Sequence, residues 1–118
     1  MTIENWDFDS QQAATRYSVA QLLAHKNLPE NAAIILEIFF VPDQDADAPA
    51  FLKALKTFGY NAETEEESLE GGGTQLAVLI TIEKTEMSAD NIWLHEERTT
   101  KIALARGYKP DGWGFLEP

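Results

Sequence analysis

The sequence predicts a single α+β domain in which a four-stranded antiparallel sheet carries helices on one face. Two dense apolar runs, at residues 33–41 and 75–85, alternate with the period of a β-strand. Amphipathic segments with helix-capping residues precede, separate and follow these runs, and glycine or proline punctuates the connections. Because 118 residues suffice for one hydrophobic core, residues 1–118 are expected to form one domain.

Helices are expected over residues 9–26, 47–58 and 88–106. Capping residues mark the starts, and glycines mark the ends of the second and third helices. The starts are Asp9 with Ser10, Asp47 and Ser88, and the stops are Gly59 and Gly107. One side of the first helix carries Ala13, Tyr17, Ala20, Leu23 and Ala24, and the stripe of the second carries Phe51, Leu52, Leu55 and Phe58.

The strands over residues 33–41 and 75–85 are largely apolar on both faces, which is typical of central strands. A strand from Tyr60 to about Leu69 has one charged face and is expected to pair with the next strand through the glycine turn at 71–73. A short final strand, residues 113–116, follows a turn at 110–112. In the first strand Ile34, Leu36, Ile38 and Phe40 share one face, and Ile35, Glu37, Phe39 and Val41 share the other.

After the first helix the expected order is βαββαβ. Two right-handed βαβ crossovers joined by a hairpin give a ferredoxin-like α/β sandwich, here with an extra N-terminal helix. One sheet face is then left without the two crossover helices. Its apolar side chains need a cover, which the N-terminal helix, a second copy of the chain or an unrelated partner could provide. These side chains are Ile35, Phe39, Ala77 and Leu79, or their neighbours of opposite parity.

Composition restricts the classes of function. The formal net charge of -11 repels nucleic acid and anionic lipid, but attracts basic proteins. The absence of cysteine excludes disulfides and thiolate metal sites. The N-terminal residues are acidic where a signal peptide is basic, so we expect a cytoplasmic protein that does not enter a membrane.

No residue pattern favours catalysis or a cofactor. His95 begins a His-Glu-Glu segment, but Thr99 stands where the zinc-helix pattern needs a second histidine. Glu96 tilts toward the apolar side of its helix, where a carboxylate requires a partner, such as Arg106, or the rim of a wet pocket. An enzyme would need a cleft that holds His95, Glu96 and Arg106 together. We therefore predict a protein that is not an enzyme and has no metal or cofactor.

Four segments within residues 33–117 resemble the RraB family, the RNase E inhibitor proteins. They are Phe39-Phe40-Val41, Phe51-Leu52 through Phe58-Gly59-Tyr60, Ser88-Ala89-Asp90-Asn91-Ile92 and Asp111-Gly112-Trp113-Gly114. The last is the most specific. The resemblance implies a ferredoxin-like fold and a protein-binding regulator of RNA turnover, because family members inhibit RNase E by binding its scaffold region. The inhibitors carry a long acidic tail after the last motif, whereas this sequence stops at Pro118; if the tail contributes to inhibition, we expect that activity to be absent.

We predict an RraB-like adaptor, as a monomer or homodimer, whose partner is a protein; the resemblance implies RNase E as the candidate. The partner-binding residues are expected to be Glu63, Glu65 and Glu67 of the charged strand, together with Trp113. The alternative is a small-ligand sensor in which two copies pair through their sheets around a pocket lined by aromatic residues.

Overall fold

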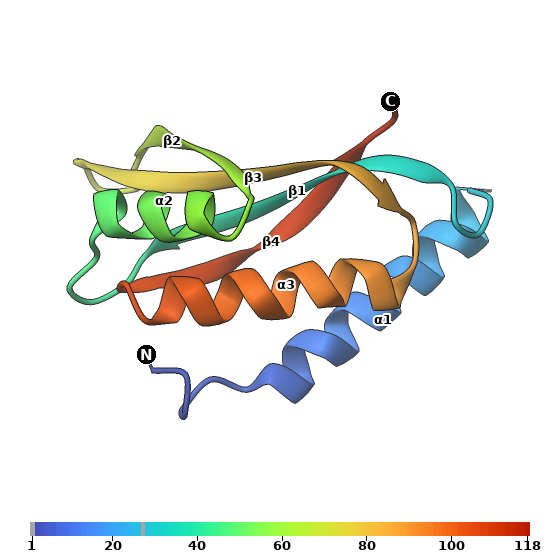
Figure 1. The fold of residues 1–118 in the computed structure, drawn as a ribbon, viewed down its shortest axis with the longest axis horizontal. Coiled ribbons are helices and arrows are strands. Elements are labelled where there is room, and N and C mark those ends of the chain that lie inside the picture. Colours follow the sequence, from blue (N-terminus) through green and yellow to red (C-terminus); the bar gives the residue numbers. More distant parts are fainter. Residues whose placement is uncertain (1, 27) are drawn as a thin grey trace.

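The computed structural model describes residues 2–26 and 28–118, which form an α+β architecture (Figure 1). In chain order the elements are α1 (Phe8–His25), β1 (Ala33–Pro42), α2 (Ala48–Thr57), β2 (Asn61–Ser68), β3 (Thr74–Glu86), α3 (Ala89–Leu104) and β4 (Tyr108–Leu116). The strands form one antiparallel sheet in the order β2-β3-β1-β4. This topology confirms the predicted ferredoxin-like arrangement with an added N-terminal helix.

The two faces of the sheet meet different surroundings because side chains alternate along each strand. Ile38 pairs with Ile80 on the side of the helices, and Phe39 pairs with Leu79 on the other side. The helix-facing residues of β1 are buried, as the sequence predicted: Ile34, Leu36, Ile38 and Phe40. All three helices contribute buried residues to the same core cluster. We call the opposite side of the sheet the open sheet face.

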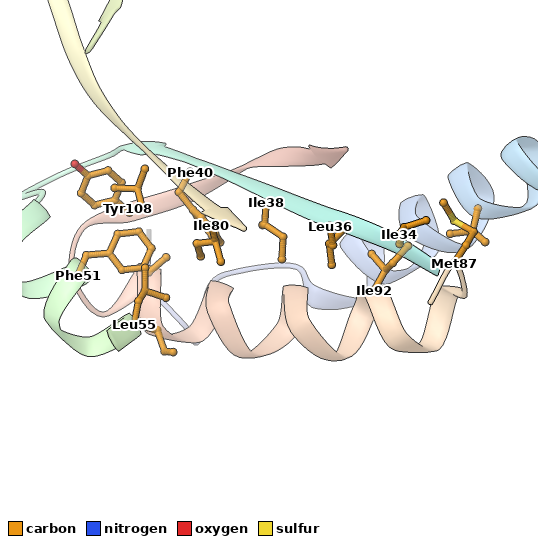
Figure 2. Close-up of a cluster of buried hydrophobic side chains, with 14 residues drawn as sticks. Ile34, Leu36, Ile38, Phe40, Phe51, Leu55, Ile80, Met87, Ile92 and Tyr108 are labelled. Atoms are coloured by element: carbon orange, nitrogen blue, oxygen red, sulfur yellow. The ribbon is translucent and has the colours of Figure 1, made fainter. Parts of the chain in front are cut away.

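Aromatic packing closes one end of the core. Phe51 of α2 is fully buried and meets Phe40 edge-on, with 5.4 Å between ring centroids. The ring of Phe51 also packs at 5.0 Å against Tyr108, whose hydroxyl donates a 2.8 Å hydrogen bond to the carbonyl of Leu76. Figure 2 shows the β1 side chains directed from the strand toward the helices. Burial of aromatic surface is therefore what fixes α2 on the sheet.

The helix α2 follows its predicted boundaries, but one residue of its predicted stripe lies outside the core. Asp47 caps the helix by accepting a 3.0 Å hydrogen bond from the backbone N–H of Ala50. Phe51 and Leu55 are buried, whereas 66% of Phe58 is exposed. Phe58 is the C-terminal cap residue, where the chain already turns away from the helix axis, so its side chain no longer faces the sheet.

The predictions for α1 were wrong in two details. Its cap is Asp7, whose carboxylate accepts a 2.9 Å hydrogen bond from the N–H of Ser10. The buried residues of α1 are Thr15 and Val19, while Tyr17, placed on the narrow apolar side, is 67% exposed. The helix packs beside α3 and leaves the open sheet face uncovered, so α1 is not the cover that this face was expected to need.

The final strand is longer than predicted. It begins at Tyr108, directly after Gly107, and the expected turn at 110–112 is instead a bulge inside the strand. Gly107 has φ +78°, and a Cβ atom there would lie 2.5 Å from the carbonyl oxygen of Gln44. The close approach of the 43–47 loop allows Asp43 to donate a 2.7 Å backbone hydrogen bond to Gly107. This contact starts β4 early.

Truncation of Phe51 tests the role of aromatic packing. We expect Phe51→Ala to lower the free energy of unfolding by about 3–5 kcal/mol, because it removes a fully buried ring and leaves a cavity. Phe58→Ala, at the C-terminal cap of the same helix, is the matched control, with an expected change within about 0.5 kcal/mol. Urea denaturation followed by circular dichroism measures both changes, and equal losses in the two variants would contradict the assignment of the core.

Candidate functional site

The first candidate surface is the open sheet face along β2. Glu63, Glu65 and Glu67 follow one another on this face, opposite Leu79, Ala77 and Gln75 of β3. We call these three glutamates the acidic row. Alternate residues on a strand lie about 7 Å apart, so the row presents a line of closely spaced negative charges. Glu63 and Glu65 are exposed and Glu67 is partly buried, so the carboxylates are accessible to a partner.

An apolar strip lies beside the acidic row. Leu79 and Ala77 are only 8% and 6% exposed, and Phe39 of β1 is partly buried. The ring of Phe39 reaches over Gly114 of β4, within 3.9 Å of where a Cβ atom would stand. Two alternatives were open for the face away from the crossover helices, and the structure shows the one with Ile35, Phe39, Ala77 and Leu79 on it. Neighbouring side chains cover much of this strip.

The second candidate surface is a groove of about 750 Å³ between α1 and the edge strand β4. One wall is the side of α1 that carries Thr15, Ser18 and Leu22, and the other carries Trp113 and Phe115 of β4. We call it the α1–β4 groove. Its lining is mostly apolar, with neutral hydroxyl and amide groups along α1.

Glu96 of α3 is the acidic residue in the lining of this groove. Its side chain is 4% exposed, and its Oε1 atom accepts a short hydrogen bond from the hydroxyl of Thr15. Burial raises the pKa of Glu96 to about 7, although hydrogen bonds from Thr15 and Gln11 act in the opposite direction. At neutral pH this carboxyl therefore exchanges between its protonated and charged forms.

Further side-chain contacts hold α1 against α3. Gln11 donates a 3.1 Å hydrogen bond to the hydroxyl of Thr100 and accepts one of 2.9 Å from the indole of Trp6. The rings of Phe8 and Trp93 meet edge-on at 6.5 Å. These contacts position α1, which forms one wall of the groove.

The family model described as regulator of ribonuclease activity B matches residues 12–115. The chain therefore belongs to the RraB family. The match includes most of α1, the acidic row, α3 and β4 up to Phe115, so both candidate surfaces lie within it. A comparison with curated proteins gave no significant match.

The structure of this RraB-family chain separates the predicted partner-binding residues. Glu63, Glu65 and Glu67 lie on the open sheet face of the edge strand β2. Trp113 pairs with Ile38, so it lies on the helix-facing side of the opposite edge strand and lines the α1–β4 groove. The four residues therefore cannot form one compact binding surface.

The residues of the alternative enzyme hypothesis, His95, Glu96 and Arg106, do not converge on one pocket. The Nδ1 atom of His95 lies 3.0 Å from the hydroxyl of Tyr60, and burial lowers the pKa of this histidine. Glu96 instead faces α1. Arg106 donates a 3.2 Å hydrogen bond to the carbonyl of Ile102, so the expectation that Arg106 pairs with Glu96 was wrong. Of the two environments expected for Glu96, a partner or the rim of a pocket, the structure shows both: Thr15 is its hydrogen-bond partner, and Glu96 lines the α1–β4 groove.

Sequence reasoning missed Thr15 as the partner of Glu96. The two residues are 81 positions apart, and the packing of α1 on α3 brings them together. The available signal was the series Gln11, Thr15 and Ser18, which places uncharged polar groups on one side of α1.

Neither a candidate metal site nor a membrane-spanning helix occurs among the described residues. Across residues 2–26 and 28–118, no group of three or more histidine, aspartate or glutamate side chains could hold a metal ion. Within the same ranges, no helix combines the length and the apolar character needed to cross a membrane.

The raised pKa of Glu96 predicts a pH-dependent stability. Between pH 4.5 and about 7 the folded chain holds a proton on Glu96 that the unfolded chain releases, so stability is lost as pH rises through this window. The Glu96→Gln variant lacks this titrating group. As pH rises from 4.5 to about 7, we therefore expect the free energy of unfolding of the native chain to fall by up to roughly 3 kcal/mol relative to that of the variant. Urea denaturation at several pH values measures this difference, and parallel pH profiles would contradict it.

Proposed function

We propose that this RraB-family chain is a cytoplasmic, protein-binding regulator that modulates RNase E, and hence RNA turnover, by binding the scaffold region of that endoribonuclease. The family match over residues 12–115 carries the proposal. The family's description names a regulator of ribonuclease activity, so in this proposal the ribonuclease, and not this chain, cleaves the RNA. In this proposal the chain acts by occupying a surface of the enzyme.

The acidic row is the proposed docking surface. Its three carboxylates lie on one exposed strand of a chain whose formal net charge is -11. Such a surface accelerates encounter with a basic protein segment and repels a phosphate backbone. The negative charge of the chain therefore favours contact with the ribonuclease protein over contact with RNA.

The partly buried apolar strip provides a short-range complement to these charges. Phe39 lies one strand beyond Leu79, which faces Glu63 directly. A partner segment with basic side chains and an apolar residue between them could contact the row and Phe39 together. Apolar contact adds affinity that does not depend on salt, whereas the charges mainly determine the association rate.

The charges also argue against the alternative of a sensor that dimerises through its sheets. If two copies paired face to face with their β2 strands opposed, the two acidic rows would meet, and like charges in contact are unfavourable. The open sheet face is therefore better suited to a basic partner than to a second copy of this chain.

Charge reversal of the acidic row tests the docking surface. We expect the triple variant Glu63→Lys, Glu65→Lys and Glu67→Lys to bind RNase E scaffold fragments with an association rate constant at least about tenfold lower at low salt. The salt dependence of that rate should also flatten, because the steering charge is lost. Stopped-flow fluorescence at several salt concentrations measures both effects.

The matched control reverses three other acidic residues, Glu4, Glu30 and Glu97, which lie outside the acidic row. It changes the net charge equally, so a loss confined to the first variant identifies the row and not the overall charge. Equal binding by the native chain and the acidic-row variant would refute this docking site. Absence of any binding of scaffold fragments to the native chain would refute the proposed partner.

A further inference from the structure

Glu96 in the α1–β4 groove lacks a positively charged partner within the described chain. Thr15 and Gln11 supply its hydrogen bonds, and no cation contributes to the shift of its pKa. A carboxylate that is 4% exposed is unfavourable without a cation, because burial removes water that would otherwise solvate it. A positive charge brought into the groove from outside would therefore be favoured at this position.

The walls of the groove suit the apolar stem of such a cation. Trp113 and Phe115 present aromatic side chains from β4, and Tyr17 lies on the α1 wall. Aromatic rings attract lysine and arginine cations through their π faces and pack against the methylene groups of these side chains. The groove thus combines one buried carboxyl with aromatic surface.

The strand beside the groove is open to an approaching chain. β4 is at the edge of the sheet, so one side of its backbone does not pair with another strand. Gly112 and Gly114 flank Trp113 and carry no side chains, and a Cβ atom at Gly112 would meet nothing within 4 Å. A polypeptide can therefore come close to β4 next to Trp113.

We propose that the α1–β4 groove receives a lysine or arginine side chain from a protein partner, with Glu96 as the counter-ion and Trp113 and Phe115 as the apolar wall. This second site lies on the helix-facing side of the opposite sheet edge from the acidic row. It goes beyond the proposed function, because it does not require the partner to be RNase E.

Other ionisable groups in the lining restrict where the cation can lie. Tyr17, His25 and Lys26 line the groove from α1, whereas the lining residues of β4 are proline, glycine and aromatic residues without an acid or base. His25 and Lys26 lie about 15 Å along the helix from Thr15, from a rise of about 1.5 Å per residue. The positive charge of Lys26 disfavours a second cation at that end and directs the basic side chain toward Glu96. An anionic ligand would be repelled by ionised Glu96.

Proton release accompanies binding at this site. A cation stabilises the ionised form of Glu96, so the complex loses the proton that the free chain carries below pH 7. Affinity should therefore fall by up to about tenfold for each pH unit below 7, and should level off above it.

The capped peptide N-acetyl-Leu-Arg-Leu-amide is a direct probe of the groove. In NMR titrations of the native chain, we expect millimolar or tighter binding, with shifts at the Trp113 indole N–H and at Thr15. The carboxyl carbon of Glu96, followed over pH with saturating peptide, should titrate at a pKa at least about one unit lower than in the free chain. The same peptide with neutral citrulline in place of arginine should bind at least about tenfold more weakly.

Two variants complete the experiment. Glu96→Gln keeps an oxygen that can accept the hydrogen bond from Thr15; it should bind the arginine peptide at least about tenfold more weakly and without dependence on pH between about 5.5 and 7.5. The acidic-row variant should bind it as the native chain does, which separates this site from the sheet surface. The inference is overturned if the peptide causes no groove shifts in the millimolar range, if citrulline or Glu96→Gln binds equally well, or if the shifts map to the acidic row.

Discussion

The helix-facing side of β1 is buried at the centre of the sheet, and the placement of the other elements follows from this burial. β1 pairs with both β3 and β4, and its four buried side chains meet residues from all three helices. Because side chains alternate strictly, burying this side forces Glu37 and Phe39 to the open sheet face. The register of β3 then fixes which residues of β2 join them, and so determines where the acidic row lies.

The attachment of α1 follows a different principle. This helix does not extend the sheet, and it is held to α3 by a buried hydroxyl–carboxyl contact, an amide hydrogen bond and an edge-on aromatic pair. Together with Val19, which belongs to the core cluster, these contacts place α1 beside β4. The result is a groove beside β4 whose base holds an ionisable group near its titration point at neutral pH.

The two candidate surfaces therefore act over different distances. The acidic row consists of accessible charges that influence a partner before contact and lose influence as salt increases. Glu96 is shielded from water, so it interacts strongly only with a group that enters the groove. Trp113, which the sequence grouped with the acidic row, belongs to the second surface because its position in β4 turns it toward the helices.

The amino-acid sequence predicted the order of helices and strands and the central position of β1 and β3 through its periodicity and capping residues, and the charge of β2 through its glutamates. It misplaced the start of β4, because the contact of Gly107 with the 43–47 loop joins residues about 60 positions apart. Three features depend on the packing of distant segments: α1 lies beside α3, Thr15 contacts Glu96, and Trp113 lies at the sheet edge opposite the acidic row. Local patterns specify the environment that a residue prefers, whereas the residue it meets depends on how distant elements pack.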